Sequence, residues 1–216
     1  MMNTSAANVE PRSVHDVYAE GLRYFMGQGQ LHGALAQLSA DLKRHGIDYV
    51  VIGAVALMAH GYPRFTEDID LVLTAEGLEA FHRELIGLGY APAFQGARKR
   101  LWATRDGVPV EVIVAGEYPG DGRPKPVEFP VPATAATEID GVRFVTLEKL
   151  IELKLASGMT TPDRLKDLAD VQELIKARGL TSEFAERLHP YVREQFLTLC
   201  RAVEGARQSS STDERE

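Results

Sequence analysis

Hydrophobic positions along this 216-residue chain follow two different periods, which divide it into two parts. Up to about residue 145, short β-branched runs bounded by glycine or other turn-forming residues indicate buried strands that alternate with helices. From Thr146 onward the apolar positions recur with helical spacing only. The pattern predicts an α+β fold, or α/β with a mixed sheet, in which a strand-rich N-terminal lobe precedes a C-terminal helical lobe.

The strand-rich part is predicted to hold at least four strands. Helical spacing predicts helices over residues 31–42, 55–60 and 75–89, the first ending near Gly46. Short apolar runs predict strands over 48–52, 69–73, 100–104 and 108–115, with 141–145 as one more. The two strands that flank residues 105–107 are expected to form a hairpin. The proline-rich residues 116–140 predict an ordered loop with at most short strands.

The helical part is predicted to begin at Thr146, which has the character of an N-cap for residues 147–158. Thr161-Pro162-Asp163 is typical of the start of a second helix, over 163–179, and later helices are expected over 182–188 and 190–204. The expected organisation is an unstructured N-terminus over 1–12, an α/β domain over 13–145, a helical domain over 146–204 and an unstructured tail over 205–216.

Composition is that of an average globular protein, with 44% hydrophobic and 25% charged residues. Apolar runs stay short of the roughly 18 residues that a membrane span needs, and the N-terminus lacks the pattern of a secretory signal. We therefore expect a soluble, cytoplasmic protein with no membrane partner. Cys200, the single cysteine, lies among helical apolar residues and is expected to be buried.

The net charge of −7 argues against broad affinity for nucleic acids, which requires a concentrated cationic surface. A local basic cluster nevertheless surrounds the single tryptophan. It consists of Arg98, Lys99, Arg100 and Arg105. Either a substrate track or a solvated strand edge is consistent with this cluster.

Asp68 and Asp70 stand at the start of a predicted strand. Side chains two residues apart on a strand share one face, so both carboxylates converge while Ile69 faces the core. Two like charges this close raise each other's pKa unless a cation neutralises them. Oxygen ligands of this kind suit Mg²⁺, which retains water and is completed by substrate phosphates. An Asp-x-Asp pair alone is also compatible with a surface strand end.

Gly53 and Ala54 form a tight turn between a predicted strand and a helix. Backbone N–H groups at such a turn face outward and favour an anion, so the turn predicts a phosphate site fifteen residues before the acidic pair. Arg64, just ahead of that pair, is a candidate contact to phosphate or to the metal shell. His60 precedes Gly61 at a helix end, where we expect it to serve the helix C-terminal carbonyls rather than catalysis.

The segment VVIGAVALMAHGYPRFTEDIDLVL resembles the signature of the nucleotidyltransferase superfamily, which has the DNA polymerase β-like fold. HGYPRFTEDIDLVL and KLASG…RLKDLADVQELI are similar to the bacterial group that includes the AbiEii toxins of toxin–antitoxin systems. The resemblance covers about residues 47–178. The α/β domain over 13–145 would then be the nucleotidyltransferase domain.

The resemblance implies further site residues. Glu111 matches the third carboxylate of the family, as a ligand of a second metal ion or as the base, unless it faces solvent at a sheet edge. Lys154 would offset charge on the triphosphate, and Asp167 or Asp170 would complete the site. A surface ion pair between Lys166 and Asp170 is the structural alternative. The family usually has Gly-Gly or Gly-Ser where this chain has Gly53-Ala54, which predicts a weaker grip on phosphate.

The implied activity is transfer of a nucleoside monophosphate from a nucleoside triphosphate (NTP) to a hydroxyl acceptor, with Mg²⁺ as cofactor and ATP binding among the expected properties. The acceptor is open between tRNA, a protein hydroxyl and a small antibiotic. A cognate antitoxin is an expected partner if the protein is the toxin of such a system. A non-catalytic binding module that kept the same scaffold is the alternative from a different class.

Overall fold

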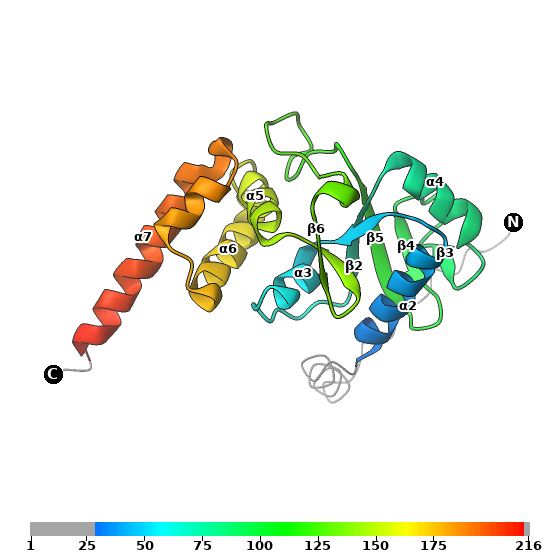
Figure 1. The fold of residues 1–216 in the computed structure, drawn as a ribbon, viewed down its shortest axis with the longest axis horizontal. Helices are drawn as coiled ribbons and strands as arrows, with labels where there is room; N and C mark the ends of the chain where they lie inside the picture. Colours follow the sequence, from blue (N-terminus) through cyan, green and yellow to red (C-terminus); the bar gives the residue numbers. More distant parts are fainter. Residues whose placement is uncertain (1–28, 214–216) are drawn as a thin grey trace, which may run out of the picture.

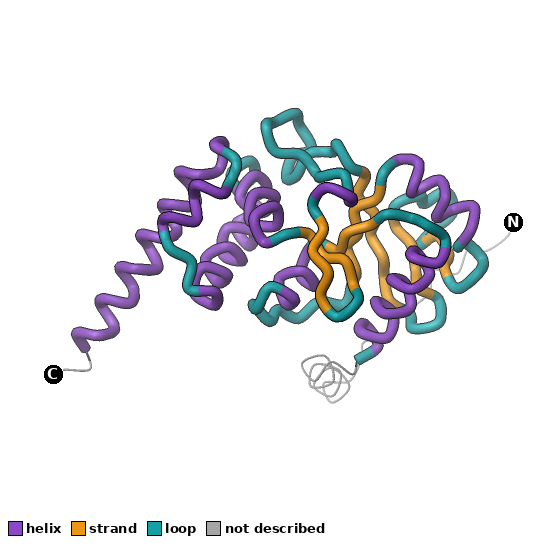
Figure 2. The backbone as a smooth tube through the Cα atoms, in the orientation of Figure 1, coloured by secondary structure: helices purple, strands orange, loops and turns teal. Residues whose placement is uncertain are grey.

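The computed structural model describes residues 29–213, with side chains described up to residue 207. The expected unstructured segment 1–12 lies outside this range. A sheet with flanking helices forms one part of the molecule, and a group of helices forms the other (Figure 1). Figure 2 shows that the strands lie in one part of the molecule and that the other part is helical. This arrangement confirms the α+β fold predicted from the sequence.

One mixed sheet of seven strands, in the order β3-β4-β5-β2-β1-β7-β6, forms the first part. The central strands β2 and β5 run parallel, as do β1 and β7, while the other neighbours are antiparallel. The strands are β1 (Tyr49–Val51), β2 (Ile69–Leu73), β3 (Tyr90–Pro92), β4 (Arg100–Ala103), β5 (Val108–Val114), β6 (Ala136–Ile139) and β7 (Val142–Val145).

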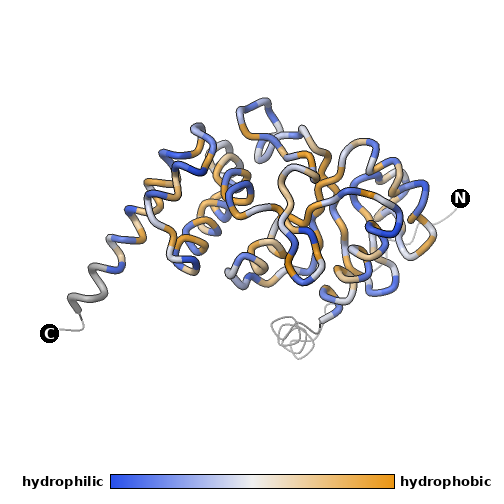
Figure 3. Tube along the Cα trace, viewed as in Figure 1, coloured by the Kyte–Doolittle hydropathy of each residue, from blue (hydrophilic) through white to orange (hydrophobic). Residues whose placement is uncertain are grey.

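One face of the sheet is covered by α2 (Gln30–Arg44) and α4 (Ala75–Glu84). Tyr90 ties the two helices to the edge of the sheet, since its ring packs edge-on against Phe81 of α4 and its hydroxyl donates to Asp41 of α2 at 3.0 Å. Apolar residues of the strands fill this layer, including Ile69 and Leu71, which are fully buried. Figure 3 shows the hydrophobic residues concentrated along the strands.

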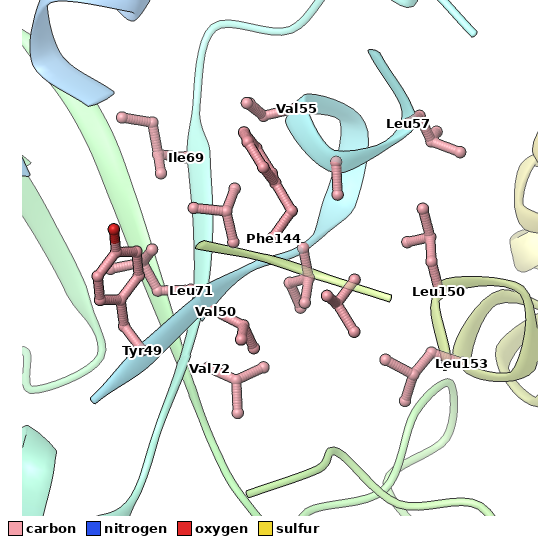
Figure 4. Packing of buried hydrophobic residues seen from close by; sticks show 14 of the residues in the cluster. Tyr49, Val50, Val55, Leu57, Ile69, Leu71, Val72, Phe144, Leu150 and Leu153 are labelled. Carbon is pink, nitrogen blue, oxygen red and sulfur yellow. The ribbon is translucent and has the colours of Figure 1, made fainter. Parts of the chain in front are cut away.

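The opposite face of the sheet meets α3 (Gly53–Ala59) and the helical part. Figure 4 shows Leu150 and Leu153 of α5 beside the sheet, where the register partners Val50 and Val72 share one face. This packing joins the helical part to the sheet through one continuous hydrophobic core.

The helical part consists of α5 (Leu147–Gly158), α6 (Leu165–Arg178) and α7 (Pro190–Asp213), with short 3₁₀ turns at Pro162–Arg164 and Ser182–Arg187; a further 3₁₀ turn, Pro132–Thr134, precedes β6 in the sheet part. Thr146 caps α5 as predicted, accepting the Lys149 N–H at 3.4 Å, and Gly179 ends α6 with a left-handed φ of 61°. No helix within residues 29–213 is both long enough and apolar enough to span a membrane.

Several boundaries differ from the sequence predictions. The helix expected over 75–89 ends at Glu84. The segment after it contains strand β3, which was not predicted because three residues are too few to show an alternation of apolar and polar side chains. Residues 182–187 form a 3₁₀ turn rather than the expected α-helix. Helix α7 continues to Asp213, through residues expected to be an unstructured tail, because extending a formed helix is far easier than starting one.

His60 connects the end of α3 to the sheet. Its buried ring donates from Nε2 to the carbonyl oxygen of Val145 at the end of β7, at 2.7 Å, instead of serving the carbonyls of its own helix. Burial is the main cause that lowers the pKa of His60 from the value near 6.5, against the opposing effect of the Val145 carbonyl. The ring is therefore neutral and structural.

This lowered pKa makes the stability pH-dependent. Below about pH 6.5 the unfolded chain binds a proton at His60 more readily than the folded chain does, so the contribution of His60 to folding is lost as the pH falls. Replacing His60 with glutamine, which can still donate to Val145, is expected to reduce the loss of unfolding free energy between pH 7 and pH 5.5 by up to about 1 kcal/mol. Urea unfolding at both pH values measures this; equal losses in the two proteins would contradict it.

Candidate active site

A cleft of about 420 Å³ lies between the sheet and the helical part. Its wall on the sheet side comes from the turn before α3, the start of β2 and the exposed face of β5, and its opposite wall comes from α5 and the start of α6. The sequence-predicted residues that line it are Gly53, Ala54, Arg64, Asp68, Asp70, Glu111, Lys154 and Asp167. Asp170 is buried behind this wall and does not line the cleft.

Parallel pairing of β2 and β5 brings two of the predicted carboxylates together. Asp70 is the direct register partner of Glu111, so both side chains lie on the same face, and Asp68 joins that face from the residue before the strand. Thr66, two residues before Asp68, donates a hydrogen bond from its hydroxyl group to the Asp68 carboxylate. The possibility that Glu111 lies on the other side of the sheet is thereby excluded.

Glu111 lines the cleft and also has a basic neighbour. Its side chain is 48% exposed and approaches Arg100 on the adjacent strand β4, with 3.8 Å between Oε1 and Nε. Among residues 29–213, no three histidine, cysteine, aspartate or glutamate side chains lie close enough to hold one metal ion. The assignment of Asp68, Asp70 and Glu111 as metal ligands stays a prediction.

Electrostatics of the cleft are dominated by its carboxylates. Burial, followed by the charges of Asp68 and Glu111, raises the pKa of Asp70 from 3.8 to about 7, against the opposing effect of Lys154 and Lys166. Asp68 and Asp70 form an anionic pair of oxygen donors, which suits a hard cation such as Mg²⁺ that keeps water and accepts phosphate oxygens as further ligands. The donor set therefore fits the predicted cofactor.

Gly53 is required by the geometry of this site. Helix α3 begins at Gly53 rather than at the predicted Val55, and Gly53 has a left-handed φ of 67°. A Cβ at this position would lie 2.0 Å from Oδ2 of Asp70. The main chain is held in place by the Ile52 N–H, which donates to the carbonyl oxygen of Asp70 at 2.9 Å. Only glycine leaves room for the carboxylate against the turn.

The helical part contributes a buried ion-pair network. Lys154 of α5 lies between two aspartates of α6, with Nζ 2.9 Å from Oδ1 of Asp167 and 2.7 Å from Oδ2 of Asp170. Arg64 pairs with the same Oδ2 of Asp170 at 3.0 Å, and Ser157 donates to Asp167 at 2.7 Å. Asp170 thus pairs with Lys154 and Arg64, not with Lys166 as the structural alternative supposed.

This network fixes the charge state of Asp167. Burial acts to raise the pKa of Asp167, but Lys154 and the Ser157 hydroxyl outweigh it, so the pKa lies below its usual value. Two cations and two carboxylates together make the network neutral. Its members are Lys154, Arg64, Asp167 and Asp170.

The basic cluster near Trp102 is also paired with acids. Arg98 bonds to Glu79, Lys99 bonds to Glu117 at the edge of the cleft, and Arg100 approaches Glu111. These pairs reduce the positive charge that the cluster presents.

Some residues of the cleft were not singled out from the sequence. They are Thr66, Glu117, Ser157, Arg164 and Lys166. Thr66 and Ser157 lie inside the segments HGYPRFTEDIDLVL and KLASG, so the family resemblance could have pointed to them. The start signal at Thr161-Pro162 could have pointed to Arg164 and Lys166, because it places both cations at the beginning of α6, three and one residues from Asp167.

The mixed sheet, with its acidic pair beside a glycine turn, defines a nucleotidyltransferase. A family model described as "Nucleotidyl transferase AbiEii toxin, Type IV TA system" matches residues 34–209. The chain therefore belongs to the AbiEii nucleotidyl transferase toxin family, which confirms the resemblance found in the sequence. A search of curated proteins gives no match.

Two solved structures illustrate the likeness. ANT(2")-Ia in complex with adenylyl-2"-tobramycin is 15% identical with a TM-score of 0.46, over 77% of this chain and 92% of that chain. An antigenic nucleotidyltransferase-like protein from Paracoccidioides brasiliensis is 19% identical with a TM-score of 0.47, over 84% and 91%. Both scores are below 0.5, so the assignment rests on the family match.

Replacing Gly53 with alanine is expected to destabilise the protein by about 2 to 4 kcal/mol, because left-handed backbone strain adds to a clash with Asp70. Gly46 is the matched control, since its φ is 64° and a Cβ there would meet nothing within 4 Å. Gly46→Ala should lose only the backbone contribution of about 1 to 2 kcal/mol. Chemical denaturation compares the two variants, and equal losses would show that the close approach to Asp70 is unimportant.

Lys154 supports the fold as well as lining the cleft. Lys154→Met keeps a side chain of similar length. It removes the ion-pair partner of the buried Asp167 and leaves Asp170 paired with Arg64 alone. We therefore expect a loss of about 3 to 5 kcal/mol in unfolding free energy. Lys176→Met, which removes an exposed cation from α6, should change stability by less than about 1 kcal/mol. A Lys154→Met protein as stable as the wild type would contradict the structural role.

Proposed function

We propose that this protein transfers a nucleoside monophosphate from an NTP to a hydroxyl acceptor, as the toxin of a type IV toxin–antitoxin system. The observation that carries the proposal is the convergence of Asp68 and Asp70 on one face of the sheet, directly beside the Gly53 turn, in a cleft of about 420 Å³. Family membership supports the reaction class.

Mg²⁺ is the proposed cofactor. Asp68 and Asp70 would hold it, and Glu111 would serve a second ion or act as a base. When bound, the cation supplies positive charge to the phosphates of the nucleotide. The raised pKa of Asp70 is consistent with this role, because burial and then the charges of Asp68 and Glu111 disfavour the ionised carboxylate, and a bound dication favours it.

The chain's own groups have distinct proposed tasks in the transfer. The backbone N–H groups of Gly53 and Ala54 contact phosphate oxygens, as does Arg64 from the loop before β2. Glu111 stands at the open side of the cleft, where its exposed carboxylate can accept the proton of the acceptor hydroxyl. The acceptor oxygen then bonds to the α-phosphorus, and the bond from that phosphorus to the bridging oxygen breaks to release pyrophosphate.

Lys154, Asp167 and Asp170 are proposed to act mainly by holding the helical wall of the cleft in position. Lys154 borders the cleft and contributes to the local potential, as its effect on Asp70 indicates. Its positive charge, however, is balanced mainly by the ion pairs with Asp167 and Asp170.

The acceptor is proposed to be tRNA or a protein, encountered in the cytoplasm where NTPs are abundant, and the partner that neutralises the toxin is a cognate antitoxin. A small antibiotic is the other hydroxyl acceptor to be tested. Incubation with each labelled NTP and total cell extract, followed by separation of RNA, protein and small metabolites, identifies which fraction receives the label.

Asp70→Asn is expected to leave the fold intact and reduce label transfer by about 100-fold or more, because it removes an anionic oxygen donor from the centre of the site. Asp48→Asn, an equivalent change at an exposed surface ion pair with Arg143, should keep wild-type transfer. Undiminished transfer by Asp70→Asn would refute the proposed site. Absence of both transfer and any stabilisation by NTP with Mg²⁺ in the wild type would indicate a non-catalytic binding module instead.

A further inference from the structure

Two cations at the start of α6 form no ion pair with the network just described, although the charge of Arg164 helps to lower the pKa of Asp167. Arg164 ends the 3₁₀ turn Pro162–Arg164, and Lys166 lies in the first turn of α6. Both line the cleft opposite Gly53, Asp68 and Asp70. Within the described side chains of residues 29–207, neither forms an ion pair, whereas the other two cations of the cleft, Arg64 and Lys154, are both paired with aspartates.

A cation without an ion-pair partner can offset the negative charge of a ligand in the cleft. A triphosphate brings several negative charges to a site that already contains the carboxylates of Asp68, Asp70 and Glu111. The Lys154 network is neutral as a whole, and α3, with seven residues, is too short for its N-terminus to supply much positive potential. Arg164 and Lys166 line the cleft and form no ion pair with a described residue.

Lys166 faces the same cleft as the acidic pair. Lys166, Asp68 and Asp70 all line this cleft of about 420 Å³, so a ligand in it lies near all three side chains. Lys166 is exposed and Arg164 only partly buried, so both side chains can reach a ligand in the cleft.

The segment that carries these cations is firmly held. A Cβ on Gly158, at the end of α5, would lie 2.6 Å from the Leu168 side chain and 3.3 Å from the Arg164 carbonyl oxygen. The loop at Gly120 packs equally tightly, since a Cβ there would lie 2.9 Å from the Ser157 carbonyl oxygen. The backbone at the start of α6 therefore packs closely against the end of α5.

We propose that Arg164 and Lys166 form the binding site for the β- and γ-phosphates of the NTP, opposite the Asp68–Asp70 pair. This inference rests on the proposed function, since it assigns the leaving pyrophosphate to the helical wall of the same cleft. The guanidinium of Arg164 offers two parallel donors to phosphate oxygens, and Lys166 offers a compact point charge. The sheet side then holds the α-phosphate, where the bond breaks.

The test uses inorganic tripolyphosphate with Mg²⁺, because this probe carries the phosphates without a base and so does not require knowledge of which NTP is used. Isothermal titration calorimetry on the full chain measures its Kd. Arg164→Gln and Lys166→Gln are each expected to weaken binding about tenfold or more, and the double variant more than either. Lys166→Arg, which keeps the charge, should bind within about threefold of the wild type.

Lys176→Gln is the matched control, because it removes the same charge from the other end of α6, where Lys176 pairs with Glu173. It should leave the Kd unchanged. Circular dichroism and unfolding midpoints of all variants show whether each is folded. The proposal is overturned if the folded double variant binds tripolyphosphate as tightly as the wild type, or if the wild type does not bind it.

The outcome separates this proposal from the proposed function. Asp70-dependent transfer combined with normal tripolyphosphate binding by the double variant refutes the phosphate site alone. Weakened binding by the Arg164 and Lys166 variants, without label transfer by the wild type to any fraction, supports the phosphate site and refutes the transferase.

Discussion

The contact between the Asp70 carboxylate and the backbone of Gly53 is the constraint on which the site depends. A left-handed φ and the absence of a Cβ let the turn before α3 approach β2 closely enough for a phosphate-binding backbone and an anionic ligand to share one cleft. The Ile52 N–H and the Asp70 carbonyl join the same two segments through the main chain. Any larger residue at position 53 would push the turn and the carboxylate apart.

A second level of organisation follows from charge. Buried carboxylates are tolerated only when cations compensate them, and in the helical part Lys154 and Arg64 do so for Asp167 and Asp170. Because Arg64 precedes β2 and Asp170 lies on α6, this pairing also links the two parts of the molecule. The charge of Lys154 and Arg64 is largely balanced by these aspartates, so cations outside the network are the main groups left to offset the charge of a ligand.

Much of the fold could be predicted from the sequence, because the buried strands β1, β2 and β5 are apolar, β-branched runs and the caps at Thr146 and Gly179 have strong local signals. Strand β3 could not, since it has only three residues, the last of them a proline, and so carries too little alternation. The expected tail after residue 204 was wrong because composition describes isolated segments, while α7 is extended from a helix already packed in the core.

Of the candidate site, the sequence could predict which residues meet but not how they pair. The period of two places Asp68 and Asp70 on one face, and parallel register then adds Glu111, yet only coordinates show that Glu111 approaches Arg100. The family resemblance assigns Lys154 and Asp167 to the site without revealing that they neutralise each other. Side-chain pairing depends on distances of a few ångströms between elements far apart in the chain, so the division between structural and ligand-binding cations emerges only in three dimensions.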